Sequence, residues 1–154
     1  FNTSLSWKGF DLSAIFAYSI GGYIYNRDIT MILHNGSLEG RDWSTEILKR
    51  WTPENRYTDV PALSTTSNNW NSASTRFLQN NSYMRLKNLT LSYDLPKQWI
   101  SKLALSSVQV FVQGDNLFTI HRNQGLDPEQ GITGITYYRY PAMRTISGGI
   151  NLSF

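Results

Sequence analysis

The stretch from Arg144 to Phe154 constrains the fold most, because its polarity alternates up to the final aromatic residue. Such a period of two predicts a β-strand with one apolar face and one polar face. The terminal residues of soluble domains are usually polar and poorly ordered, whereas here the apolar face continues to the last residue. The apolar positions are Ile146, Gly148, Ile150, Leu152 and Phe154, and the other positions are Ser147, Gly149, Asn151 and Ser153.

The composition favours a membrane β-barrel over an ordinary soluble domain. Charged residues make up 16% of the chain, against about a quarter in typical soluble domains. Ser, Thr and Asn take their place, and small neutral polar groups of this kind line the lumen of a barrel whose outer face is apolar. No apolar run approaches the roughly 20 residues that a transmembrane helix needs. We therefore expect any membrane crossing to be made by strands.

Charge and residue chemistry argue against nucleic-acid binding, metal binding and catalysis. The net charge is +3, but Lys and Arg are scattered without a basic run, so we expect no nucleic-acid partner. There is no cysteine, and His34 and His121 complete no usual zinc set. Asp127 and Glu129 indicate a turn rather than a metal pair. Since phosphate-loop and nucleophile-elbow motifs are also missing, we predict neither an enzyme nor a cofactor.

Five segments alternate like strands, and their connections alternate in length. A tight turn at Lys8-Gly9 joins the first two. At the start of the third, Arg85 and Lys87 share the parity of the apolar residues, so either the apolar band ends there or a bulge shifts the register. Short periplasmic turns and long extracellular loops are typical of outer-membrane barrels. The expected strands are 1–8, 10–20, 83–94, 107–118 and 144–154, and the long loops are 21–82 and 119–143.

Two pieces of the first long loop have helical spacing. Residues 25–33 place apolar side chains three and four apart before Asn35-Gly36. Residues 42–51 place Trp43, Ile47 and Trp51 at steps of four, behind a possible cap at Asp42. The apolar stripe is interpreted as packing.

Two resemblances support a barrel. Ser147, Gly149, Leu152 and Phe154 resemble the C-terminal assembly signal that the barrel assembly machinery reads in outer-membrane proteins. Motifs along nearly the whole chain are similar to the last barrel strands of SusC/RagA-type TonB-dependent transporters, with small departures at Tyr57 and Ala62. These motifs are Lys8–Leu12, Gly21-Gly22, Tyr25-Asn26, Arg50–Asn55, Thr58–Pro61, Tyr83–Tyr93, Leu95-Pro96, Val108–Phe118, Gly125–Glu129, Tyr140-Pro141 and the Phe154 ending.

The family resemblance implies import of glycans or peptides across the outer membrane of a Gram-negative, Bacteroidetes-type bacterium. Such transporters have a plugged barrel of roughly 22 strands, a SusD-like surface lipoprotein as lid, and energy from TonB with ExbB and ExbD. On this interpretation residues 1–154 supply about the last five antiparallel transmembrane strands, in contact with membrane lipid. The TonB box and the plug would belong to a missing N-terminal part.

Loop aromatic residues are the candidates for ligand or lid contact, since an aromatic face stacks on a sugar ring or a peptide side chain. Packing of loop on loop is the alternative for each of them. Two other functions stay open: a soluble glycan-binding β-sandwich, and an outer-membrane lipase or protease, which would need a Ser/His/acid arrangement. The candidate contacts are Trp43, Trp70, Tyr137, Tyr138 and Arg139.

Overall fold

The chain forms two compact units, which are described one at a time. The first consists of Phe1–Gly21, Asn81–Asn123 and Pro141–Phe154, and the second of Gly22–Asn80 and Gln124–Tyr140. The structure is a computed structural model. It describes residues 1–34, 36, 38, 40–64, 66, 72–101, 105–123, 127–129, 133–137 and 139–154.

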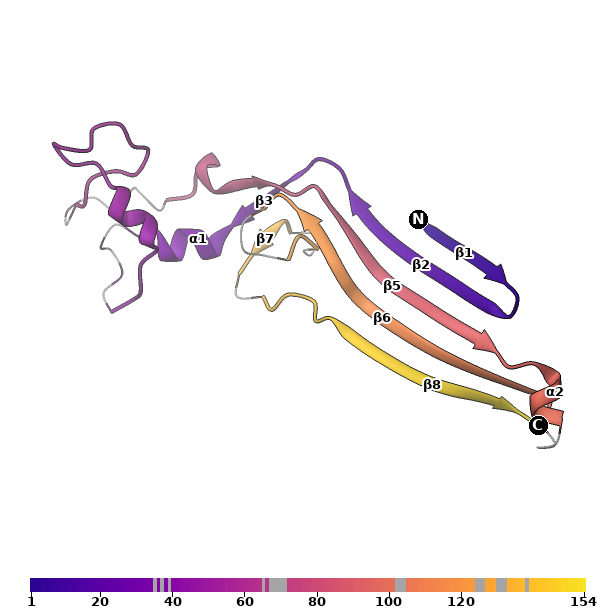
Figure 1. Ribbon diagram of the computed structural model, residues 1–154. Helices are drawn as coiled ribbons and strands as arrows, with labels where there is room; N and C mark the ends of the chain where they lie inside the picture. Colours follow the sequence, from indigo (N-terminus) through magenta and orange to yellow (C-terminus); the bar gives the residue numbers. More distant parts are fainter. Residues whose placement is uncertain are drawn as a thin grey trace. The chain divides into compact units, whose positions relative to one another are not determined.

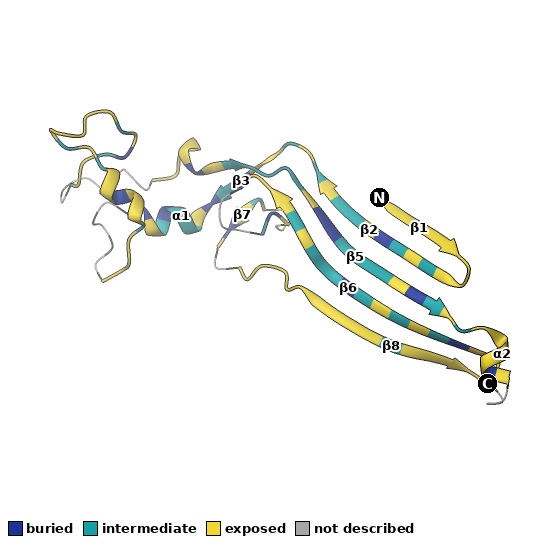
Figure 2. Ribbon diagram, viewed as in Figure 1, coloured by how far each residue is buried: buried dark blue, intermediate teal, exposed yellow. Residues whose placement is uncertain are grey.

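The first unit is a five-stranded antiparallel sheet in the order β1-β2-β5-β6-β8 (Figure 1). The predicted all-β class with antiparallel strands is thereby confirmed. Each central strand pairs on both sides, whereas β1 and β8 pair on one side only within the described part of the chain, and every residue of both strands except the half-buried Gly149 is exposed (Figure 2). The strands are β1 (Asn2–Trp7), β2 (Phe10–Ser19), β5 (Tyr83–Asp94), β6 (Ser107–His121) and β8 (Thr145–Ser153).

Short connections lie at one end of the sheet. Lys8 and Gly9 both have positive φ, 49° and 86°, which is the conformation that matches the twist of a two-residue hairpin. Between β5 and β6 the chain makes the short helix α2 (Lys97–Ile100), which follows Pro96. The last pair of β6 and β8 at this end is Ser107 with Ser153.

Both long connections leave from the opposite end. Ser19 pairs with Tyr83, and Tyr83 pairs with His121, so β2, β5 and β6 reach that end together. Strand β6 therefore runs to His121, past residue 118 where the sequence pattern ends, because Arg85 pairs with Thr119. The long connections thus lie at one end of the sheet and the short connections at the other.

A β-bulge interrupts β5, as one of the two sequence interpretations required. Ile15 pairs with Asn88 and Phe16 with Leu86, so Lys87 is an extra residue relative to β2. The extra residue reverses the parity of β5. As a result Leu86 lies on the same face as Leu89, although the two differ in parity.

The second unit contains a small sheet that the sequence pattern does not reveal. Its strands are β4 (Leu78–Asn80), β3 (Tyr23–Asn26) and β7 (Ile135–Thr136), with β3 antiparallel to β4 and parallel to β7. Ile24 and Phe77 are almost fully buried in its core. Strands this short carry too few residues for a period of two to be recognised.

The helical segments of this unit are shorter than expected. Over residues 25–33 the structure has β3 and then α1 (Arg27–Ile32), which Asn26 caps by accepting from the Ile29 N–H at 3.1 Å. Over residues 42–51 it has the 3₁₀ helix η1 (Thr45–Lys49), and η3 (Thr75–Phe77) precedes β4. The predicted Asp42 cap is wrong, because the Ser44 side chain caps η1 instead. No helix in the described part of the chain is long and apolar enough to span a membrane.

Candidate functional site

The sheet has two chemically different faces, which follow from its register. Residues that pair directly share a face, and successive residues alternate between faces. One row across all five strands is apolar, and the neighbouring row is polar and uncharged. The apolar row is Leu5, Leu12, Leu91, Val112 and Gly148, and the polar row is Ser4, Ser13, Thr90, Gln113 and Ser147.

The apolar face is exposed. Leu5 is 68% exposed, Leu12 39% and Val112 48%. A contiguous apolar surface of this extent indicates contact with lipid or with another protein. Aromatic rings gather on the same face at the end of the sheet with the short connections. The rings of Phe10 and Tyr93 pack with their centroids 4.4 Å apart. The Lys8 amine lies 5.0 Å from the centroid of the Trp7 ring. Aromatic residues at the end of a membrane-spanning strand are typical of a membrane–water interface.

Side-chain hydrogen bonds run across the polar face. The Asn88 amide donates to Asp115 at 2.8 Å, and the Gln113 amide donates to both Asp115 oxygens at 3.2 Å. The Thr90 hydroxyl in turn donates to the Asn88 oxygen at 3.0 Å. Amide donors thus hold this carboxylate in place. Nearer the short connections, the Gln109 amide donates to Asp94 at 2.9 Å and accepts from Asn151 at 3.2 Å.

The predicted assembly-signal residues lie on β8 or next to it. Ser147 and Gly149 are on the polar face, whereas Leu152 pairs with Val108 on the apolar face. The Phe111 ring covers Gly149, and a Cβ added there would lie 2.8 Å from the ring. This contact accounts for an aromatic residue on the polar face of β6. Phe154 follows the strand and is 90% exposed.

Three of the five candidate loop contacts, Trp43, Tyr137 and Arg139, lie among the described residues. Trp43 packs edge-on against the buried His34, with ring centroids 5.0 Å apart, so its environment favours packing of loop on loop. The Arg27 guanidinium lies 4.6 Å from the centroid of the Tyr137 ring. Arg139 is exposed. Trp70 and Tyr138 lie outside the described residues.

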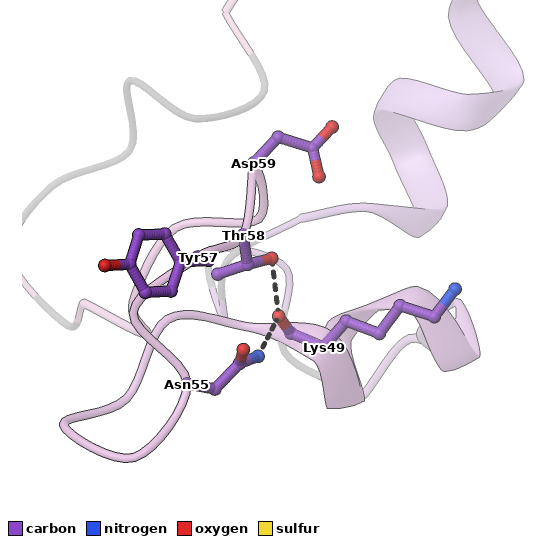
Figure 3. A pocket seen from close by; sticks show the side chains of 5 residues that line it. All are labelled: Lys49, Asn55, Tyr57, Thr58 and Asp59. Atoms are coloured by element: carbon purple, nitrogen blue, oxygen red, sulfur yellow. Dashed lines mark hydrogen bonds between the residues drawn. The ribbon is translucent and has the colours of Figure 1, made fainter.

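A hollow that the sequence reasoning missed lies in the segment after η1 (Figure 3). It has a volume of about 660 Å³ and is lined by Lys49, Asn55, Tyr57, Thr58 and Asp59. Tyr57 is fully exposed. The one signal in the sequence for this hollow was Tyr57, at which the chain departs from the family pattern.

No group of three His, Cys, Asp or Glu side chains that could hold a metal ion occurs among the residues with described positions. Asp127 instead accepts a hydrogen bond from the Glu129 N–H at 2.9 Å, which is the turn that the sequence indicated.

The chain is similar to known outer-membrane receptors over its whole length. It is 33% identical to TonB-dependent receptor P3 of Formosa agariphila, covering 100% of this chain and 16% of that protein. It is 28% identical to TonB-dependent receptor SusC of Bacteroides thetaiotaomicron, covering 99% of this chain and 14% of that protein. The RagAB peptide importer in its open-open state matches with a TM-score of 0.88 and 34% identity, over 99% of this chain and 16% of that chain. The chain belongs to the SusC/RagA-type TonB-dependent receptors.

This SusC/RagA-type chain spans about one sixth of the length of the curated relatives that it matches. No family model matches it. Its location is the outer membrane of a Bacteroidetes-type bacterium. The named relatives are receptors and an importer rather than enzymes.

Proposed function

We propose that this chain is part of the wall of an outer-membrane transporter that imports oligomeric nutrients, glycans or peptides, with energy delivered through TonB. The observation that carries the proposal is the pair of adjacent rows, one apolar and exposed, the other polar and hydrogen-bonded. A wall between lipid and a water-filled lumen needs this arrangement on every strand.

Partners follow from the same proposal. A SusD-like surface lipoprotein would cover the barrel, and the plug and the contact with TonB, ExbB and ExbD would come from sequence outside residues 1–154. The barrel assembly machinery would insert the protein. A soluble glycan-binding β-sandwich fits less well, because a sandwich buries the apolar faces of its sheets, whereas Leu5 and Val112 stay exposed.

The test is uptake by cells of the bacterium that carries the gene. Fluorescent pools of oligosaccharides and of oligopeptides are supplied to wild-type cells, to cells lacking the gene and to cells lacking TonB. We expect uptake of one pool to fall about tenfold or more in both mutants, because passive entry of large polar solutes across the membrane is slow. Unchanged uptake of both pools in cells lacking the gene would refute the proposal. The pool that responds identifies the class of cargo.

A further inference from the structure

The turn that joins β1 to β2 carries a lysine at a position where its backbone favours other residues. Lys8 has a φ of 49°, in the left-handed region that Gly, Asn and Asp adopt most readily in a two-residue hairpin. A lysine at this position costs stability compared with Asn or Gly. Because residues kept in such a conformation cluster at functional sites, the Lys8 side chain calls for a reason beyond the turn itself.

The backbone of this turn is held against β5. The Asp94 N–H donates to the Gly9 carbonyl at 2.8 Å. A Cβ added at Gly9 would lie 3.2 Å from the Asp94 carbonyl oxygen and 3.3 Å from the Tyr93 ring, so the turn packs closely on this strand. The Tyr93 ring in turn packs on Phe10. The sheet thus presents Lys8 from a fixed position.

Lys8 and Trp7 together offer a positive charge and hydrogen-bond donors. Both side chains are exposed, and the Lys8 amine lies near the Trp7 ring, which is on the apolar face of the sheet. Among the described residues, neither the Lys8 amine nor the Trp7 N–H has a hydrogen bond or an ion pair. An ammonium and an indole N–H donate hydrogen bonds and accept none. The ligand that fits this pair is therefore an oxyanion.

The nearby carboxylates of the sheet belong to its opposite face. The register places Asp11 and Asp94 on the polar face. There the Ser6 hydroxyl donates to Asp11, and the Gln109 amide donates to Asp94 at 2.9 Å. Charges of opposite sign are thus divided between the two faces at this end of the sheet. The positive charge of Lys8 is left for a negative group that approaches from the apolar side.

From these observations we propose that the Lys8 turn binds the phosphate of an anionic phospholipid in the membrane leaflet that surrounds the short connections; this inference rests on the transport function proposed above, in which the apolar face contacts lipid. A phospholipid presents its phosphate beside its acyl chains, at the level where membrane-spanning strands end. A lysine near such a headgroup favours negatively charged lipids. The quaternary ammonium of a phosphatidylcholine would instead be repelled by the cation that already lies beside the Trp7 ring.

The experiment uses the full-length receptor, purified in detergent, and a photoactivatable phosphatidylglycerol with its reactive group next to the glycerol. The label on peptides that contain residues 7–10 is measured by mass spectrometry, while unlabelled phosphatidylglycerol or phosphatidylcholine with identical acyl chains competes. For wild type, phosphatidylglycerol should displace the label at about fivefold lower concentration, which is the contribution of one lysine near an anionic headgroup. Lys8→Gln should remove this difference, and Lys8→Arg should keep it. Lys49→Gln, at an exposed lysine of the second unit, is the matched control and should behave like wild type.

Lys8→Asn separates lipid binding from a structural role of the turn. Asn is a preferred residue at this position of a two-residue hairpin. The variant should therefore unfold in lipid-free detergent at the same temperature as wild type or a higher one, as measured by a heat-modifiability gel. Its preference for phosphatidylglycerol should nevertheless be lost, because the cation is gone.

Three results would overturn the proposal. The first is displacement of the label from wild type by both lipids at the same concentration. The second is a preference for phosphatidylglycerol that persists in both Lys8→Gln and Lys8→Asn. The third is displacement by inorganic phosphate as effective as displacement by phosphatidylglycerol, which would make the turn a site for soluble anions. Each leaves uptake through TonB intact, whereas failure of the transport function would appear as unchanged uptake in cells lacking the gene.

Discussion

At the scale of single residues, the contact between Phe111 and Gly149 explains two positions that a regular alternation does not. The ring takes the space above the glycine, so a side chain at the position opposite Phe111 on β8 would displace the ring. Aromatic cover of a glycine in this way supports an edge strand. The sequence predicts both the strand and the importance of Gly149, but it shows Phe111 only as an exception, since the register between the strands is a tertiary property.

Replacement of Gly149 by Val in the full-length receptor should destabilise the folded barrel by about 1–3 kcal/mol, because the new side chain forces the Phe111 ring from its place. The measurement is the temperature at which the folded species disappears in a heat-modifiability gel. Phe111→Ala is the control background: there Gly149→Val should cost clearly less, since the space above the strand is open. Equal cost in both backgrounds would contradict the role of the contact.

At the scale of strands, the bulge in β5 keeps the apolar face continuous. Without it, Met84 and Leu86 would lie with Thr90 on the polar face. The sequence leaves open whether the apolar band ends or the register shifts at this point, because both interpretations satisfy the local alternation. Pairing with β2 decides between them, and this pairing joins residues that are about 70 positions apart in sequence.

Because this chain has no cysteine, single cysteines can map its faces, in a background from which any cysteines elsewhere in the receptor are removed. A water-soluble maleimide should label the polar face and spare the apolar face, which in the proposed transporter wall contacts lipid, where a thiol does not ionise. We expect the pattern to switch parity at Lys87. Labelling of only odd-numbered or only even-numbered positions from residue 83 to 93 would contradict the bulge. Labelling is expected at 83, 85, 90 and 92, and protection at 84, 86, 89 and 91.

At the scale of the whole molecule, the position of the long connections was the most predictable feature. Two short and two long gaps between alternating segments are visible in the sequence, and the register places both long gaps at one end of the sheet. The internal structure of the long connections was not predictable, since β3, β4 and β7 contain four residues or fewer. The contact between Trp43 and His34 was likewise not predictable, because it is known only from the fold.

Phe154→Asp in the full-length receptor should lower its amount in the outer membrane several-fold. A charge near the interface costs only about 0–1 kcal/mol of folded stability, so a large drop would reflect poor recognition during assembly. Surface levels are measured with an antibody to an external loop. Phe154→Tyr, which keeps the aromatic ring, should reach normal levels. Normal levels of the Asp variant would contradict the assembly signal.

The second unit has a further consequence for how such receptors diversify. It carries its own small sheet, buried core and capped helices, and none of its described residues takes part in the strand pairing of the five-stranded sheet. Selection can therefore change side chains of the second unit without altering the strand register of the five-stranded sheet.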